Sequence, residues 1–213
     1  HTIGRRQRQM CIRDRDKSQK FHFWINEISP NMSPYSHRLN IKLVECKYID
    51  DLDSDKYKIY IRGIKNSISI FREENIPLFT KMETKQQEYG SIVAKMNIEV
   101  NGEKLTMQKA QLLLKDTNRS FREEIYNKIQ KRRLQDEKVL DNLYDELIEL
   151  RQKIANNAGF KNYRDYMFSA MGRFDYTATD CYNFHDAIEQ EIVPIITSLE
   201  KKRKEKLNYE VYR

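Results

Sequence analysis

Histidine pairing is the first sign of metal-dependent chemistry to look for, and this sequence has only four histidines: His1, His22, His37 and His185. A zinc hydrolase typically carries H-E-x-x-H on a helix, because two imidazoles one turn apart bind the same ion while the Glu activates water. No two of the four histidines have that spacing. His185 and Glu189 could reach one metal from a helix face, but no further ligand candidates lie nearby. We therefore interpret His185 as a residue at the edge of the core, and His22 and His37 as surface or packing residues.

Nucleophilic and phosphate-binding motifs are also absent: there is no G-x-S-x-G, P-loop or G-x-G-x-x-G sequence. Cys181 falls on the apolar stripe of its expected helix, which favours a buried, inert thiol over a nucleophile. The residues themselves thus indicate no catalytic, cofactor-binding or metal site. Clustered aromatic residues favour core packing over stacking on nucleic-acid bases; they are Tyr163, Tyr166, Phe168, Phe174 and Tyr176.

The number and spacing of the cysteines indicate the cellular compartment of the protein. Three cysteines (Cys11, Cys46 and Cys181) form an odd set without C-x-x-C spacing, which predicts reduced thiols in a cytoplasm. No apolar run approaches the roughly 18 residues that a membrane helix needs, and the sequence does not open with an apolar signal region. We expect a cytoplasmic protein without membrane contact.

The opening stretch RRQRQMCIRDR, residues 5–15, would normally suggest a basic arm for nucleic acid or membrane. Its codons can instead be written as a transposase-type sequencing adapter read in one frame, so we interpret residues 1–15 as a non-native, disordered leader. The formal net charge is +7, from 39 basic and 32 acidic residues. Residues 1–15 hold five Arg and one Asp, so without them 34 basic and 31 acidic residues remain, a charge of +3. That mixed remainder predicts no nucleic-acid partner.

A mainly α-helical fold is indicated by the composition, with 33% charged residues and only six Gly and four Pro. Ser29-Pro30 should end the first helix, because the residue before a proline is disfavoured in the helical region. A second helix should begin at Ser33, and Pro194 should kink the last one. Apolar spacing and breakers predict helices at about 17–28, 33–45, 56–71, 77–90, 107–115, 119–158 and 162–170, and a final one capped by Thr179 or Asp180.

A β-hairpin interrupts the helices at about residues 95–107. Asn101-Gly102 lies between two alternating runs, which is a strong signal for a two-residue turn. That turn fixes a register in which Glu99 opposes Lys104 and Ile98 opposes Leu105, so that one face is apolar. A lone hairpin is marginally stable in water, and we expect it to pack on helices.

Two helix faces are distinctly apolar. The final helix should carry Cys181, Phe184, Ile188, Ile192, Ile195 and Leu199 on one side. The residues Leu140, Leu143, Leu147, Leu150 and Ile154 form a second, coiled-coil-like stripe, followed by Gly159 as a helix stop. That stripe leaves open a non-catalytic helical scaffold that binds a partner helix. It fades upstream into charged residues, so packing within the chain is the favoured interpretation.

A longer resemblance covers almost everything from about residue 16 to residue 213. The segments SPYSHRLNIKL, FREENIPLF, LTMQKAQLLL, LRQKIANNAGFKNYRDYMFSAMGRFDYT and DCYNFHDAIEQEIVPI resemble the oligoendopeptidase F family of zinc metallopeptidases, relatives of thimet oligopeptidase. The resemblance implies an elongated array of helices, the N-terminal half of a channel-forming metallopeptidase fold. Residues 16–213 would be its helical N-terminal region, cut off before the catalytic zinc domain.

The function that the resemblance implies is hydrolysis of internal peptide bonds in short unfolded peptides, with one zinc ion activating water. The intact gene product would be a zinc metalloendopeptidase. None of the family's catalytic positions matches a residue here, so no catalytic or metal-ligating residue is assigned, and the chain itself is expected to be inactive and free of zinc.

Overall fold

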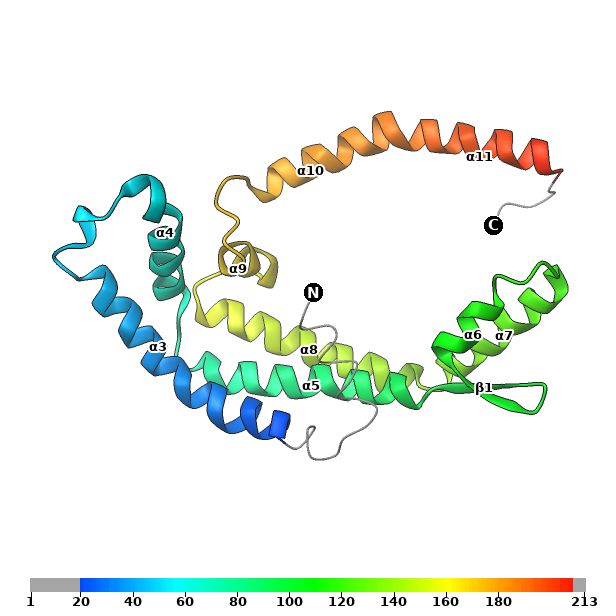
Figure 1. Cartoon of the computed structure of the whole chain (residues 1–213), viewed down its shortest axis with the longest axis horizontal. Coiled ribbons are helices and arrows are strands. Elements are labelled where there is room, and N and C mark those ends of the chain that lie inside the picture. The colour runs from blue at the N-terminus through cyan, green and yellow to red at the C-terminus, as the bar shows by residue number, and fades with distance from the viewer. Residues whose placement is uncertain (1–19, 209–213) are drawn as a thin grey trace. The chain divides into compact units, whose positions relative to one another are not determined.

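The computed structural model describes residues 20–208, which form two compact units, one ending at Tyr163 and the other beginning at Arg164. The fold is mainly helical with one two-stranded antiparallel sheet, as the sequence predicts (Figure 1). The expected leader at residues 1–15 lies outside the described residues. The first unit contains η1 (Trp24–Ile28), α3 (Ser29–Val44), η2 (Ile49–Asp51), α4 (Ser54–Ile70), α5 (Asn75–Lys95), β1 (Asn97–Val100), β2 (Glu103–Thr106), α6 (Met107–Leu113), α7 (Arg119–Leu134) and α8 (Glu137–Asn157).

The expected helix end at Ser29-Pro30 is wrong, because the chain stays helical through both Pro30 and Pro34. A single π-helical turn, η1, directly precedes Ser29-Pro30, and the Ser29 N–H donates to the carbonyl of Trp24, five residues back. Proline lacks an N–H and its ring clashes with the carbonyl four residues earlier in an α-helix. The π turn removes that conflict by lengthening the hydrogen-bonded loop. Nearby, the Asn31 side-chain amide donates to the Glu27 carbonyl at 2.6 Å.

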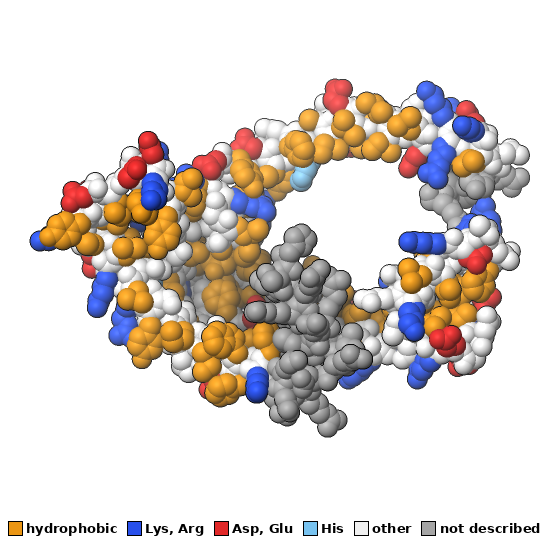
Figure 2. Space-filling view, in the orientation of Figure 1, with side chains coloured by type: hydrophobic (Ala, Val, Ile, Leu, Met, Phe, Trp, Pro, Cys, Tyr) orange, Lys and Arg blue, Asp and Glu red, His pale blue; other side chains and the backbone are white. Residues whose placement is uncertain are grey.

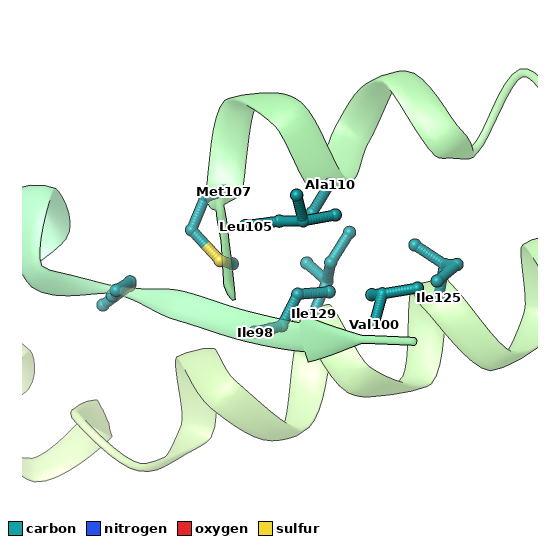
Figure 3. Packing of buried hydrophobic residues seen from close by; sticks show 8 residues of the cluster. Ile98, Val100, Leu105, Met107, Ala110, Ile125 and Ile129 are labelled. Carbon is teal, nitrogen blue, oxygen red and sulfur yellow. The ribbon is translucent and has the colours of Figure 1, made fainter. Parts of the chain in front are cut away.

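The hairpin has the predicted register, with Glu99 opposite Lys104 and Ile98 opposite Leu105. Asn101 and Gly102 both have positive φ, 53° and 79°, as a type I′ turn requires. The apolar face of the hairpin packs on α6 and α7 and forms a buried cluster (Figure 3). Its buried members are Met96, Ile98, Val100, Leu105, Met107, Ala110, Ile125 and Ile129.

The single helix expected over residues 119–158 is wrong: the structure has α7 and α8, separated at Gln135 and Asp136. Asp136 leaves helical geometry at φ −102° and ψ 7°, and Arg132 forms a 2.5 Å ion pair with its carboxylate. The two helices have different partners, since α7 contacts α6 and β1 whereas α8 runs along α5. No Gly or Pro lies at the break. The break is therefore caused by tertiary packing, which the pattern of apolar residues in the sequence does not reveal.

Helices α5 and α8 lie side by side and bury the leucine stripe (Figure 1). Leu143, Leu147, Leu150 and Ile154 are all buried, which confirms that the stripe packs within the chain. The expected end of α5 near Gly90 is wrong, since the helix continues to Lys95 along its partner. The stop after α8 is confirmed: Gly159 has φ 87°, and the Phe160 N–H reaches back to the Ala155 carbonyl at 3.0 Å, a Schellman motif.

The second unit contains most of α9 (Tyr163–Ala170), then α10 (Ala178–Ala187), η3 (Ile188–Ile192) and α11 (Val193–Leu207). The cap predicted at Thr179 or Asp180 is wrong. Thr177 is the N-cap, and it exchanges hydrogen bonds with Asp180 in a capping box. A π-helical turn again precedes a proline, since η3 ends directly before Val193-Pro194.

Candidate functional site

The three histidines in residues 20–208 have different surroundings. His22 is exposed, and His37 stacks on Phe71 with ring centroids 3.8 Å apart. His185, expected at the edge of a core, is exposed, as is Glu189. Within residues 20–208, no group of three or more His, Cys, Asp or Glu side chains is arranged to hold a metal ion. The residues present in this part of the chain therefore do not fit a zinc site.

The two cysteines in the described residues are free thiols. Cys46 is exposed, and Cys181 is half-buried on α10 rather than fully buried as expected. Over the same residues, no helix has both the length and the apolar content needed to cross a bilayer.

A buried polar cluster connects the start of α5 to the end of α8. The Asn75 side chain, only 1% exposed, donates to the Ile154 carbonyl at 3.0 Å and accepts from the Asn157 side chain at 2.8 Å. The Arg72 guanidinium donates to the Asn157 carbonyl at 3.1 Å. The Ile154 carbonyl also accepts from the Ala158 N–H at 3.3 Å, whereas the Asn157 carbonyl lies at the C-terminal end of α8, where an α-helix leaves its last carbonyls without intrahelical partners. The cluster fixes how two antiparallel helices meet.

This cluster was not found by reasoning from the sequence. Asn75 stands in the stretch FREENIPLF, two residues before Pro77, where an Asn is an ordinary turn residue. Its role depends on contacts with residues 79 and 82 positions away. The local signal that could have raised the question is the Asn-Asn pair at the end of the long apolar stripe, Asn156 and Asn157.

A second link between α5 and α8 lies at the surface. The Lys85 ammonium contacts Glu146 at 2.9 Å and Glu88 at 3.2 Å. The side-chain hydrogen bond to Glu146 is the main cause of the raised pKa of Lys85, and the same bond lowers the pKa of Glu146. Both side chains remain partly exposed, 21% for Lys85 and 46% for Glu146, so solvent screens the pair and it adds little stability.

Aromatic and charged side chains combine in the second unit. The Arg164 guanidinium pairs with Asp165 at 2.8 Å and donates to the Tyr182 hydroxyl, and these contacts raise its pKa. Phe168 and Tyr176 pack edge to face with centroids 5.8 Å apart. Such contacts hold α9 against the start of α10; they contain no nucleophile beside a base. The arrangement therefore positions α9 relative to α10.

Comparison with known families supports the resemblance seen in the sequence. Residues 112–212 match the family model described as Peptidase family M3. Among curated proteins, none matches this chain.

Three solved structures share the fold. One is described as an oligoendopeptidase F from Bacillus anthracis str. Ames, with 24% identity and a TM-score of 0.86 over 94% of this chain and 37% of that one. A second oligoendopeptidase F structure has 22% identity and a TM-score of 0.87, covering 96% of this chain and 36% of that one. PZ peptidase A, solved with an inhibitor, has 23% identity and a TM-score of 0.87 over 96% of this chain and 37% of its own.

This chain spans little more than a third of the length of those solved structures. The fold match extends over nearly the whole chain, while the family match covers its second half. The resemblance expected from the sequence is therefore confirmed: residues 112–212 are similar to the M3 peptidase family, and nearly the whole chain has the fold of the solved oligoendopeptidase F structures.

Proposed function

We propose that this chain is the helical N-terminal part of a zinc-dependent oligoendopeptidase that hydrolyses internal bonds of short unfolded peptides. The observation that carries the proposal is the fold match over 94–96% of the chain to structures described as oligoendopeptidases, joined to the M3 family match over residues 112–212. Residues 1–15 remain, in this proposal, a non-native leader.

The chemistry of the proposed enzyme belongs to residues outside this chain. The described residues contain no grouping that fits a zinc ion, so no catalytic step is assigned to them. Their proposed part is architectural: α5 and α8 form a rigid antiparallel pair, fixed by the leucine stripe and the buried Asn75 cluster. Free thiols at Cys46 and Cys181 suit the reducing cytoplasm that we propose as its compartment.

The alternative, a non-catalytic scaffold, is weakened by the structure. Its proposed binding surface was the stripe that includes Leu143, Leu147 and Leu150, and these side chains are buried against α5. A partner helix could reach them only by separating α5 from α8. The proposal of short peptides as the partners, with no nucleic acid, follows from the family and from the balanced charge of residues 16–213.

The test is to read the gene beyond the codon for Arg213 and to assay its full product. We expect an open frame that encodes H-E-x-x-H on a helix, and a product whose cleavage of short internally quenched peptides is abolished by a chelator and restored by zinc. A full-length gene without such a motif, or a product that is active only on folded proteins, would contradict the proposal.

A further inference from the structure

Residues 97–134 form a small body at one end of the α5–α8 pair, which we call the hairpin lobe. Its elements, β1, β2, α6 and α7, make their main contacts with one another, and their buried residues form most of the cluster in Figure 3. Charged side chains of both signs lie on its visible surface (Figure 2). A body with its own apolar core and a charged surface can move as a unit.

Two short connections join the hairpin lobe to the helix pair. Because α5 and α8 are antiparallel, the end of α5 at Lys95 and the start of α8 at Glu137 lie at the same end of the pair (Figure 1). Both connections leave helical geometry: Met96 is extended, with ψ 129°, and Asp136 has φ −102° and ψ 7°. Hinges are typically a few residues at the ends of elements that absorb changes in φ and ψ. The two connections therefore have the placement of a double hinge.

The apolar contacts across this joint come from one turn of each helix. Ile92 and Val93 in the last turn of α5, and Leu140 in the first turn of α8, pack against the cluster, and each is only partly buried. The far end of the helix pair is held instead by the buried hydrogen bonds of Asn75. The attachment of the lobe thus buries less apolar surface than its own core, and a rotation at the joint leaves that core intact.

Two partners compete for the Asp136 carboxylate at the joint. It pairs with Arg132 of α7 at 2.5 Å, and it makes no cap bond to α8 although Asp136 occupies the N-cap position. By contrast Asp53, the N-cap of α4, has ψ 109° and accepts from the Asp55 and Lys56 amides. Capping of α8 by Asp136 would need a similar rise in ψ from 7°. A change in that dihedral angle turns α7 relative to α8.

We propose that the hairpin lobe is a hinged body, held in its present orientation by the Arg132–Asp136 ion pair, and that it turns when Asp136 leaves Arg132 and caps α8. The two side chains of the pair are 21% and 27% exposed, so solvent screens the pair less than a fully exposed one. The cap offers the same carboxylate hydrogen bonds to backbone amides, so the two orientations are close in free energy. The proposal is independent of the proposed function, because it concerns contacts within residues 92–140.

Distances between spin labels in residues 1–213 test the hinge. The three native cysteines are replaced by Ser, and pairs of cysteines are introduced at exposed positions for nitroxide labels. The pair at Ser120 and Lys153 spans the joint; Ser120 with Lys104 lies within the lobe, and Gln86 with Lys153 lies within the helix pair. Ser120 is about 21 Å from the end of α7 at Leu134, so a lobe rotation of about 20° moves it by about 7 Å.

Arg132→Ala should shift the distance across the joint by about 5 Å or more and leave the two internal distances unchanged. Lys128→Ala is the matched control, because it removes a 2.7 Å ion pair with Glu124 that lies wholly within α7, and it should alter none of the three distances. An unchanged distance across the joint in Arg132→Ala would overturn the proposal. So would a changed distance within the lobe, which would show that the lobe deforms instead of turning.

Two variants at position 136 test the exchange of partners. Asn is as good an N-cap as Asp but cannot form the ion pair, so Asp136→Asn should give the same new distance across the joint as Arg132→Ala. Asp136→Ala can neither pair nor cap, and it should broaden the distribution without favouring the new distance. Identical distributions for the Asn and Ala variants would overturn the exchange of partners.

Discussion

Individual residues with special backbone geometry or buried polar contacts set the local structure of this chain. Gly102 and Gly159 adopt positive φ, at a hairpin turn and at a helix end. Asn75 makes two side-chain hydrogen bonds in a nearly inaccessible position. The glycine positions could be predicted because turn chemistry is local. Asn75 could not, because its partners come from the distant end of α8.

Replacing Gly102 with Val should destabilise the first unit by at least about 1–2 kcal/mol, since a β-branched residue would be forced into the left-handed region. Gly90→Ala is the matched control. Gly90 lies inside α5, an added Cβ meets no atom within 4 Å, and the change should stabilise by about 0.5–1 kcal/mol. Urea unfolding followed by circular dichroism measures both. A Gly102→Val variant that unfolds like the parent would contradict the type I′ turn.

Replacing Asn75 with Ala should cost about 1–3 kcal/mol, because the Ile154 carbonyl and the Asn157 amide would lose a buried partner. Asn157→Ala removes one of the same bonds. The double variant should therefore lose less stability than the two single variants together. Chemical unfolding of all four proteins gives the coupling energy. Strict additivity would show that the two side chains do not act as a pair.

At the scale of elements, the sequence predicted the hairpin register and the buried stripe, and it missed four helix boundaries: at Ser29-Pro30, within residues 119–158, at the end of α5 and at the cap of α10. The hairpin succeeded because the Asn101-Gly102 turn and the period-two pattern agree. The failures at Ser29-Pro30 and at Gln135 have opposite causes. A π turn, which no composition rule indicates, lets a helix pass through proline, whereas divergent packing partners break a helix that contains no breaker. The break between α7 and α8 depends on contacts outside the local window.

The cap of α10 offers a test at this scale. Thr177→Ala should destabilise the first turn of α10 by about 0.5–2 kcal/mol, because the hydroxyl oxygen accepts from the Asp180 N–H. Thr179→Ala is the control; Thr179 is exposed in the same turn and does not cap the helix. Hydrogen exchange at the α10 amides reports the change. If Thr179→Ala had the larger effect, the assignment of Thr177 as N-cap would be wrong.

The same cap should respond to acid. Hydrogen bonds from Thr177 lower the pKa of Asp180 below its ordinary value of 3.8. A carboxylate whose pKa is depressed by folding stabilises the fold above its unfolded pKa, and that contribution is lost as the pH falls through the folded pKa. Protection of the α10 amides should therefore decline below about pH 4 in the parent. The decline should be smaller in Asp180→Asn, and an identical acid profile for the two proteins would contradict the capping box.

At the scale of the whole molecule, the chain has the fold of a segment that makes up little more than a third of its solved relatives. Sequence composition predicted a mainly helical architecture, and the segments quoted above predicted the similarity to M3 peptidases. The active site of the proposed enzyme could not be predicted from this sequence, because the described residues carry no grouping of ligands that fits a metal. The apolar residues of the sequence do specify how the helices pack on one another.

Deleting residues 1–15 should leave stability within about 0.5 kcal/mol of the parent, because the segment has no apolar periodicity with which to dock. Thermal melts of residues 1–213 and 16–213 under the same buffer and salt conditions make the comparison. A chain that lacks residues 204–213 serves as a comparison, because it removes a segment from the C-terminal end, and its melt is measured in the same way. A substantially larger loss on removal of residues 1–15 would contradict their interpretation as a non-native leader.

The isolated chain should neither bind zinc stoichiometrically nor cleave peptides. Hydrolysis by a zinc site of the H-E-x-x-H type needs about three protein ligands and an open position for water. His22 and His37 lie fifteen residues apart on one helical stretch, and His185 lies on α10. Their surroundings differ, since His22 and His185 are exposed and His37 stacks on Phe71. Titration of residues 16–213 with zinc by calorimetry, and incubation with quenched peptides, test both expectations. If metal-dependent cleavage appeared, His185→Ala and Glu189→Gln would be compared with His22→Ala, and its loss in the first two alone would assign the activity to this helix face and refute an architectural role for the chain.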